Sequence, residues 1–238
     1  MIYSSFQLLY VVPLLPLLFL YLHGKRKQGQ IKRWQKSLNL GEHARIFQQV
    51  YQHENGFMLS KQARQQHDAL DYVYGEISFL SFIALLSLAK PHENTIFYDL
   101  GCGIGKAVLA CAMVFPIRKS VGVEIFPELY FAACKQAKRL ASIKNYAKKT
   151  KKIEFILGDF LEVDLNEANI IFINSTALFN PTWEMLCARL EYLPQLNTVI
   201  TTSKALPSKL FSVVMQTKVE MSWGIVLAYV HVRKKNNY

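Results

Sequence analysis

Hydrophobic and polar positions divide the chain into stretches of different pattern. From Met1 to Leu22 there is no charged side chain, and Phe6–Leu22 is apolar apart from Gln7 and two prolines. At about 1.5 Å per residue this run reaches roughly 30 Å, the hydrocarbon thickness of a bilayer. Basic residues follow the run and none precedes it: Lys25, Arg26, Lys27, Lys32 and Arg33. We therefore predict a single-pass membrane anchor over residues 1–23, with the N-terminus outside and the body of the chain in the cytoplasm. A buried N-terminal helix is the alternative.

The next stretch, residues 24–71, is polar and rich in Gln, Lys and Arg. Apolar residues recur in it at helical spacing: Ile46, Phe47, Val50 and Tyr51. This periodicity predicts one or two helices that link the anchor to a folded domain. We predict that this domain fills residues 72–238, and that its first element is a buried helix over Ile77–Leu88.

Short apolar runs and helical segments then alternate along the chain. The runs predicted as strands are Ile96–Leu100, Val121–Ile125, Ile153–Leu157, Ile170–Ile173 and Thr198–Thr201. Helices are predicted over about Lys106–Val114, after Pro127 and near Thr182–Tyr192. Repeated strand–helix units predict an α/β protein, in which a parallel sheet carries helices on both faces. The tail adds two predicted strands that form a hairpin, Val213–Val219 and Ile225–Val232.

Composition narrows the classes of protein that the chain can belong to. At 238 residues and 51% hydrophobic content, the chain can bury one substantial core, which argues against disorder. The four cysteines form no C-x-x-C pair, so we predict neither a disulfide framework nor a metal site. The net charge of +11 favours an acidic partner, although solubility and membrane topology account for it equally well.

The clearest chemical signal is the run Asp99-Leu100-Gly101-Cys102-Gly103-Ile104-Gly105, between a predicted strand and a predicted helix. Such a glycine turn lets a ligand lie against bare backbone, beside the unpaired N–H groups of a helix N-terminus. Dinucleotide-binding proteins space their glycines as G-x-G-x-x-G to hold a pyrophosphate. Here the spacing is G-x-G-x-G, and Asp99 stands two residues before the first glycine. A carboxylate there repels a pyrophosphate but attracts the ammonium of an amino acid, which favours S-adenosylmethionine as the cofactor.

Two further acids follow predicted strands where an adenosyl ligand needs them. Glu124 lies near the end of the second strand, where an acid accepts hydrogen bonds from the ribose hydroxyls in nucleotide-binding folds. Asp159 follows the third strand and can accept a hydrogen bond from the adenine amino group, while Phe160 offers its ring as a stacking face. We predict that Asp99, Glu124 and Asp159 converge at the carboxyl edge of one sheet.

Several segments resemble one family, the non-SET histone lysine methyltransferases of the disruptor-of-telomeric-silencing type. They are Val73–Phe79, Asp99–Gly105, Gly122–Glu124, Gly158–Phe160, Phe172–Asn174, Ser222–Trp223 and Tyr229–His231. The resemblance implies a Rossmann-like, seven-stranded methyltransferase sheet, mostly parallel with a C-terminal antiparallel hairpin. It also implies a set of residues that bind S-adenosylmethionine: Tyr74, Glu76, Asp99, Gly101, Gly103, Gly105, Glu124, Asp159 and Phe160.

The same resemblance implies that the methyl acceptor is an accessible lysine of a protein, with Asn174 and Tyr229 as catalytic residues in its channel. Phe179 or Trp223 is expected to contribute walls. An apolar channel disfavours the charged form of the amine, and Asn174 can accept a hydrogen bond from the neutral form. The chain departs from the family in three places: Lys106 replaces a usual glutamine, Ser175 replaces a usual asparagine, and a short leader replaces a large N-terminal helical region.

Several interpretations stay open at this point. The basic stretch 135–152 is either a solvated helix face or a surface for nucleic acid or anionic lipid. Nucleic acid is not favoured, because no aromatic residues alternate with the basic ones as single-strand binding requires. The methyl acceptor is alternatively a membrane-associated small molecule or a lipid. A catalytically silent cofactor-binding module and a nicotinamide oxidoreductase are the competing classes.

Overall fold

The computed structural model describes residues 14–65 and 73–234 of the chain. The chain divides after Glu42 into two units. The first unit contains helix α2 (Leu14–Ser37) and the first residues of α3 (Leu40–Tyr51). The second unit contains the rest of α3, helix α4 (Gly56–Ala63) and every later element. The polar stretch after the predicted anchor is therefore helical, as its periodicity predicts, and it contributes α3 and α4.

Helix α2 bears directly on the predicted membrane anchor, of which residues 1–13 lie outside the described residues. A membrane-spanning helix needs about 20 consecutive apolar residues. The sequence of α2 turns basic at Lys25 and stays mostly polar as far as Ser37. Within residues 14–65 and 73–234, no helix is both long enough and apolar enough to cross a bilayer. The predicted localisation, with an outside N-terminus and a cytoplasmic catalytic domain, is therefore wrong, and the described residues give no support to the predicted transmembrane helix or membrane partner.

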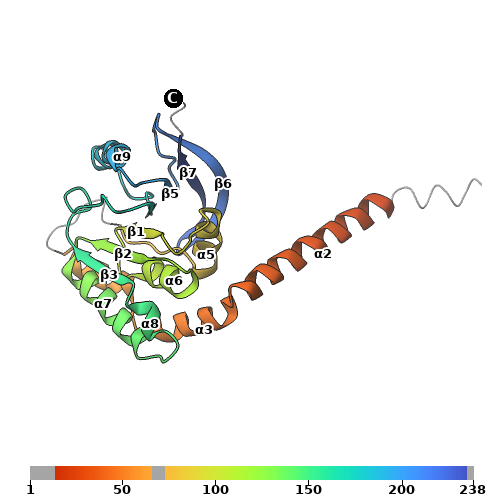
Figure 1. Ribbon diagram of the computed structural model, residues 1–238, viewed down its shortest axis with the longest axis horizontal. Coiled ribbons are helices and arrows are strands. Elements are labelled where there is room, and N and C mark those ends of the chain that lie inside the picture. The colour runs from red at the N-terminus through yellow and green to blue at the C-terminus, as the bar shows by residue number, and fades with distance from the viewer. Residues whose placement is uncertain (1–13, 66–72, 235–238) are drawn as a thin grey trace, which may run out of the picture. The chain divides into compact units, whose positions relative to one another are not determined.

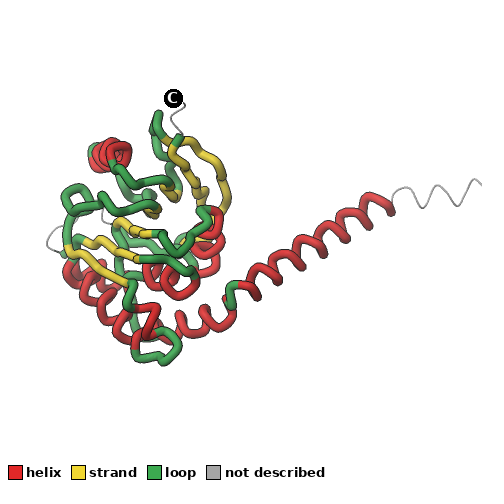
Figure 2. Tube along the Cα trace, in the orientation of Figure 1, coloured by secondary structure: helices red, strands yellow, loops and turns green. Residues whose placement is uncertain are grey.

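Seven strands of the second unit form one sheet (Figure 1, Figure 2). They are β1 (Ile96–Leu100), β2 (Lys119–Glu124), β3 (Ile153–Leu157), β4 (Ile170–Ile173), β5 (Thr198–Thr202), β6 (Phe211–Met221) and β7 (Gly224–Arg233). Their order across the sheet is β3-β2-β1-β4-β5-β7-β6. The first five strands are parallel, and β7 runs antiparallel between β5 and β6. This confirms the predicted seven-stranded sheet with its C-terminal antiparallel hairpin.

Helices cover both faces of the sheet (Figure 1). Three helices pack on one face: α5 (Phe79–Leu88), α6 (Lys106–Val114) and α7 (Pro127–Ala141). The short helix α8 (Ala147–Thr150) contacts α6 and α7, and α9 (Thr182–Tyr192) covers the opposite face. The structure thus has the three-layer arrangement that strand–helix alternation predicts.

The alternation of side chains along β1 determines which face of the sheet Asp99 points to. Phe97 faces α5, where its ring contacts Phe82 with 5.9 Å between the ring centroids. Tyr98 and Leu100 belong to the buried cluster on the other face, which includes α9. Because side chains alternate with a period of two along a strand, Asp99 shares the face of Phe97, and it lies one residue before the end of β1.

The C-terminal hairpin is tied to α9 by Arg233 at the end of β7. The guanidinium donates hydrogen bonds to the carbonyls of Leu190, Glu191, Leu193 and Leu196. These carbonyls lie at or just beyond the C-terminus of α9, where backbone acceptors have no partner within the helix and positive charge is favoured.

Replacing Arg233 by Met is expected to destabilise the fold, because the carbonyls of the α9 C-terminus lose their donors. Hydrogen bonds to charged groups contribute about 1.5–3 kcal/mol, so we expect the free energy of unfolding to fall by about 2 kcal/mol. For a chain of this size the melting temperature should then fall by about 4–8 °C. Thermal denaturation followed by circular dichroism measures this, with the exposed Lys218→Met on β6 as the control. Equal melting temperatures for the two variants would contradict this role of Arg233.

Candidate functional site

The site is built where the carboxyl ends of adjacent parallel strands meet. Asp99 of β1 lies opposite Gly122 of β2, and Glu124 is the last residue of β2. Asp159 follows β3 by two residues, and β3 pairs in parallel with β2. Ligands bind outside this edge in open α/β sheets, because the loops that leave it are free to vary. The sheet topology therefore brings the three predicted acids to one edge.

The glycine turn between β1 and α6 takes backbone conformations that other residues adopt rarely. Gly101, Gly103 and Gly105 have φ values of 78°, 55° and 79°. A side-chain carbon on Gly103 would lie 2.5 Å from Cε2 of Tyr74, so the bare backbone is needed there for packing as well. Helix α6 begins after Gly105 without a side-chain cap. The first turn of α6 therefore offers the backbone N–H groups that a helix N-terminus leaves unpaired.

Glu124 is held rigidly by the backbone around it. Its Oε2 accepts a hydrogen bond from the N–H of Gly103 (2.7 Å), and its Oε1 accepts from the N–H groups of Ile125 and Phe126 (3.0 Å each). Burial raises the pKa of Glu124, and the three backbone donors counteract part of that rise. A carboxylate fixed in this way is suited to accept hydrogen bonds from a pair of ligand hydroxyls.

Asp99 is as buried as Glu124, at 4% exposure, but its environment differs. Burial and the neighbouring charge of Glu124 raise the pKa of Asp99 to about 8. Among the described residues, no hydrogen-bond donor counteracts that rise, in contrast to the three that support Glu124. A cation placed against Asp99 would remove much of this penalty, because an opposite charge nearby favours the ionised carboxylate. Asp99 therefore fits the ammonium end of an amino-acid ligand.

Two adjoining cavities occupy the carboxyl edge of the sheet. The larger, of about 200 Å³, is lined by Glu124, Asp159, Phe160 and Asn174, among others. The smaller is lined by Asp99, Glu76, Lys106 and the glycine turn. Both are lined by Tyr74, Gly75, Gly101 and Asn174, so the two form one continuous site. The larger cavity suits an adenosine and the smaller suits an amino-acid end.

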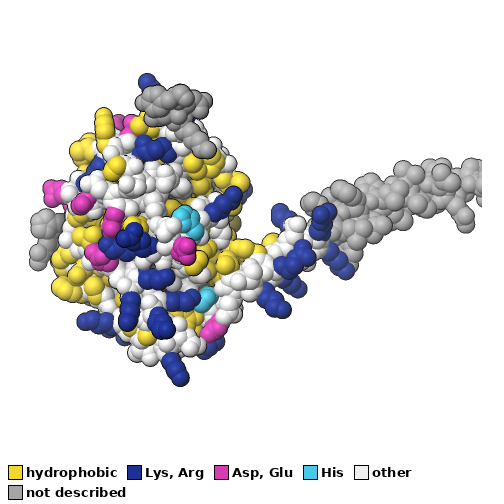
Figure 3. Space-filling model, viewed as in Figure 1, with side chains coloured by type: hydrophobic (Ala, Val, Ile, Leu, Met, Phe, Trp, Pro, Cys, Tyr) yellow, Lys and Arg dark blue, Asp and Glu magenta, His cyan; other side chains and the backbone are white. Residues whose placement is uncertain are grey.

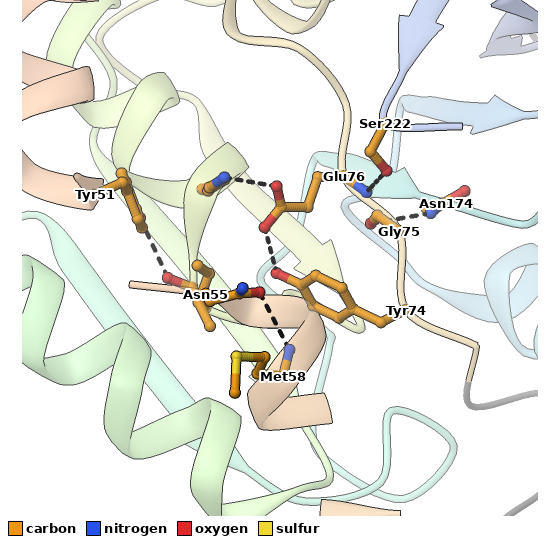
Figure 4. A network of polar contacts seen from close by, with 10 residues as sticks. Tyr51, Asn55, Met58, Tyr74, Gly75, Glu76, Asn174 and Ser222 are labelled. Carbon is orange, nitrogen blue, oxygen red and sulfur yellow. Dashed lines mark hydrogen bonds and ion pairs between the residues drawn. The ribbon is translucent and has the colours of Figure 1, made fainter. Parts of the chain in front are cut away.

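Tyr74, Glu76 and Lys106 form a polar chain beside the smaller cavity (Figure 4). The Tyr74 hydroxyl donates to Glu76 Oε1 (2.7 Å), and Lys106 Nζ contacts Glu76 Oε2 (2.5 Å). Burial and the charge of Glu76 raise the pKa of Tyr74, so the phenol stays protonated and acts as a donor. Lys106 also lies 5.4 Å from the ring centroid of Tyr51, a cation–π distance. The lysine that replaces the usual glutamine thus makes an ion pair inside the site.

The loop after β3 presents Asp159 and Phe160 to the larger cavity. Asp159 Oδ1 accepts a hydrogen bond from the N–H of Leu161 (2.7 Å). Arg189 of α9 donates to the carbonyls of Phe160 and Val163, which fixes the path of the loop. Asp159 and the half-buried Phe160 both line the larger cavity.

Asn174 lies at the end of β4, between the two cavities. Its Oδ1 accepts hydrogen bonds from the hydroxyls of Thr202 (2.8 Å) and Thr176 (3.0 Å), and its Nδ2 donates to the carbonyl of Gly75 (3.4 Å; Figure 4). Tyr229, the other predicted catalytic residue, is half-buried on β7 and does not line either cavity as the structure describes them. The structure therefore groups Asn174, and not Tyr229, with the predicted cofactor residues.

Two features of the site do not follow from the sequence analysis. Ser60 of α4 is 1% exposed and lines the larger cavity, although its stretch was predicted to be only a linker. The basic stretch 135–152 is partly used inside the protein, because Lys135 and Arg139 both contact Glu54 (3.2 and 3.4 Å). The local sequence predicts neither the place of Ser60 in the cavity wall nor the pairing of Glu54 with Lys135 and Arg139. Figure 3 shows further basic side chains on the surface of the part that contains α7 and α8.

Comparison with known proteins identifies the family. Residues 58–233 match the family model described as histone methylation protein DOT1. The chain belongs to this family. The matched region contains both cavities and the C-terminal hairpin, so the predicted resemblance is confirmed.

Individual relatives match shorter parts of the chain. A protein-lysine N-methyltransferase of Saccharolobus islandicus is 36% identical over 107 residues, covering 45% of this chain and 60% of that protein. A histone-lysine N-methyltransferase specific for H3 lysine-79, from Drosophila melanogaster, is 30% identical over 148 residues, covering 58% of this chain and 8% of that protein. In both cases the match spans less than two thirds of the relative.

Solved structures share the fold at low sequence identity. TrmN from Thermus thermophilus is 18% identical, with a TM-score of 0.50 over 64% of this chain and 48% of that chain. A candidate RNA methyltransferase from Pyrococcus horikoshii is 15% identical, with a TM-score of 0.51 over 76% of this chain and 98% of that chain. Together with the family, these likenesses establish a methyltransferase fold. The family and the fold are those of S-adenosylmethionine-dependent methyltransferases, with S-adenosylmethionine as the cofactor.

The residues present fit this cofactor. Asp99, buried and without a counter-ion, lies where an ammonium would compensate it. Glu124 and Asp159 have carboxylate oxygens at the larger cavity, which suits ribose hydroxyls and an adenine amino group. When bound, the cofactor supplies an electrophilic methyl group on a sulfonium. The assignment of each contact to a residue is our prediction from geometry.

Binding of S-adenosylhomocysteine, the reaction product, is expected to strengthen as the pH rises from about 6 to about 8. Asp99, with a pKa of about 8, is mostly protonated below that pH and must lose its proton to pair with the ammonium. Affinity should therefore rise by up to about tenfold per pH unit in this window, with release of a proton. Calorimetry in buffers of different ionisation enthalpy measures both effects. Asp99→Asn should abolish them, and pH-independent binding by the unmodified chain would contradict the pairing.

Glu124→Gln is expected to weaken binding of S-adenosylhomocysteine by about tenfold or more, because an amide replaces one acceptor of the ribose hydroxyls with a donor. A hydrogen bond to a charged group contributes about 1.5–3 kcal/mol, which corresponds to this range. Calorimetric titration measures it at one pH. The control is Glu93→Gln, an exposed acid before β1 and outside both cavities. Unchanged affinity of Glu124→Gln would remove Glu124 from the site.

Proposed function

We propose that this chain transfers a methyl group from S-adenosylmethionine to the side-chain amine of a lysine in a protein. The proposal rests on the family match over residues 58–233. A separate match, to a protein-lysine N-methyltransferase of Saccharolobus islandicus, supports it. Because the match spans only 60% of that relative, the acceptor protein is left unspecified.

The walls of the larger cavity support an amine as the acceptor. Beside Asn174 they include the apolar residues Val73, Ala177 and Leu178. A free lysine amine has a pKa of about 10.4 and is charged at neutral pH, so it must lose a proton before it can attack. Apolar surroundings disfavour the charged form and make that loss easier. Methyl transfer from a sulfonium needs alignment more than a strong base, so these walls suffice for the chemistry.

Asn174 is proposed to orient the amine. Both lone pairs of its Oδ1 are occupied, by the hydroxyls of Thr202 and Thr176. The Thr176 hydroxyl also lies 2.7 Å from the hydroxyl oxygen of Ser203, so its proton has a second acceptor. Rotation of this hydroxyl towards Ser203 would free one lone pair of Asn174 for the amine. Tyr229 is proposed as an outer wall of the acceptor path, since it lies on β7 outside the two cavities.

The experiment incubates the full chain with methyl-labelled S-adenosylmethionine and a cell lysate. Label recovered as methyllysine after acid hydrolysis of the protein fraction would support the proposal. Label that is removed by ribonuclease, or that extracts into organic solvent, would contradict it and indicate nucleic acid or lipid as the acceptor. The lysate without the chain is the control for methylation by its own enzymes, and Glu124→Gln should transfer less label than the unmodified chain when the cofactor is limiting.

Asn174→Ala is expected to lower the turnover number on the order of 100-fold, because misplacing reacting groups costs about that factor. Affinity for S-adenosylhomocysteine should change by less than about threefold, since Asn174 is proposed to act on the acceptor. Steady-state kinetics with the labelled protein and calorimetric titration measure the two quantities. Equal losses of affinity and turnover would assign Asn174 to the cofactor and not to the acceptor.

A further inference from the structure

The segment Tyr74–Ser78 is paired with the tip of the C-terminal hairpin, Met221–Gly224. The N–H of Ser222 donates to the carbonyl of Glu76 (2.8 Å), and the N–H of Glu76 donates to Ser222 Oγ (3.1 Å). One step along, the N–H of Ser78 donates to the carbonyl of Glu220 (2.9 Å), and Ile77 bridges Met221 in antiparallel fashion. These bonds join residues about 145 positions apart in the chain, and Figure 4 shows Glu76, Gly75 and Ser222 together.

Trp223 adds a steric contact to this pairing. A side-chain carbon on Gly75 would lie only 1.7 Å from Cζ3 of the Trp223 ring. The indole therefore packs directly on the bare backbone of Gly75, and 45% of the residue stays exposed. Trp223 itself lines neither cavity, in contrast to Tyr74, Gly75 and Glu76.

Gly75 is the point where several contacts of the site meet. Its carbonyl accepts the hydrogen bond from Asn174, and its neighbours are Tyr74, which packs on Gly103, and Glu76, which pairs with Lys106. A shift of Gly75 therefore moves residues of both cavities. The hairpin tip and α5 hold the other end of the segment. The N–H of Glu220, next to that tip, donates a hydrogen bond to Ser81 Oγ of α5 (3.1 Å).

We propose that Trp223 is a positioning residue for the cofactor. By packing on Gly75, it holds Tyr74 and Glu76 in the arrangement that binds S-adenosylmethionine, although it does not touch the cavities. The hairpin thus sets the affinity of the cofactor site from outside it. This inference rests on the proposed contribution of the Tyr74–Glu76 segment to cofactor binding, and it is independent of the identity of the acceptor.

The first experiment measures the dissociation constant of S-adenosylhomocysteine by calorimetry for the full chain and its variants. Trp223→Ala should weaken binding about tenfold, as expected for coupled contacts, while Trp223→Phe should stay within about threefold. The control is Ile225→Ala, since Ile225 lies two residues further on the same hairpin and is 72% exposed. If Trp223 is only a wall for the acceptor, or only stabilises the hairpin, Trp223→Ala will change the acceptor KM or the melting temperature and leave the dissociation constant unchanged, which overturns the proposal.

A double-mutant cycle with Gly75 tests the contact itself. Gly75→Ala should weaken binding about tenfold, because the added methyl group and the indole ring need the same space. In the Trp223→Ala background that space is free, so adding Gly75→Ala should then raise the dissociation constant of S-adenosylhomocysteine by less than about twofold. If the fold-change in dissociation constant of the double variant equals the product of the two single fold-changes, a direct contact is contradicted, whatever the stability of the variants.

Glu124→Gln distinguishes the two ways in which the proposal can fail. If Glu124→Gln weakens binding and Trp223→Ala does not, the cofactor site stands and the positioning role is wrong. If neither substitution weakens binding, the cofactor site itself has been assigned to the wrong residues.

Discussion

Two carboxylates are buried side by side at the carboxyl edge of β1 and β2, and the rest of the site depends on how each is compensated. Glu124 receives three backbone N–H groups, which fix its direction. Asp99 receives no comparable support, and its pKa rises to about 8 because of burial and the charge of Glu124. Such a carboxylate costs free energy when it is ionised alone and is stabilised when a cation arrives. We therefore predict that this edge prefers a ligand with an ammonium group.

The other parts of the site keep this pair in place. The glycine turn must adopt positive φ values so that the N–H of Gly103 reaches Glu124, and Tyr74 covers the same glycine. Tyr74 is in turn joined to Lys106 through Glu76, a chain that links the segment before α5 to the first turn of α6. The same segment pairs with the C-terminal hairpin through Glu76 and Ser222, which is the basis for the proposed coupling of the hairpin to cofactor binding.

The sequence predicts elements well where a local pattern determines them. β1, β3 and β4 match their predicted bounds, because each is an apolar run of fixed length ended by glycine or asparagine. The three acids lie at one edge of the sheet, since parallel strands place their carboxyl ends together; Asp99 lines the smaller cavity, and Glu124 and Asp159 line the larger one. Residues joined only by the fold could not be found: Ser60 in the cavity wall, the Lys106–Glu76 ion pair, and Glu54 beside α7. The predicted anchor finds no support in the described residues, because α2 continues past the apolar run into a polar stretch that begins at Lys25.

The central claim is that Asp99, Glu124 and Asp159 together bind one molecule of an adenosyl amino acid. A crystal structure of the full chain with S-adenosylhomocysteine tests it most directly. The account predicts the ammonium within hydrogen-bond distance of Asp99, the ribose hydroxyls on Glu124 and the adenine amino group on Asp159. A ligand bound elsewhere, or bound here with its ammonium pointing away from Asp99, would contradict the account.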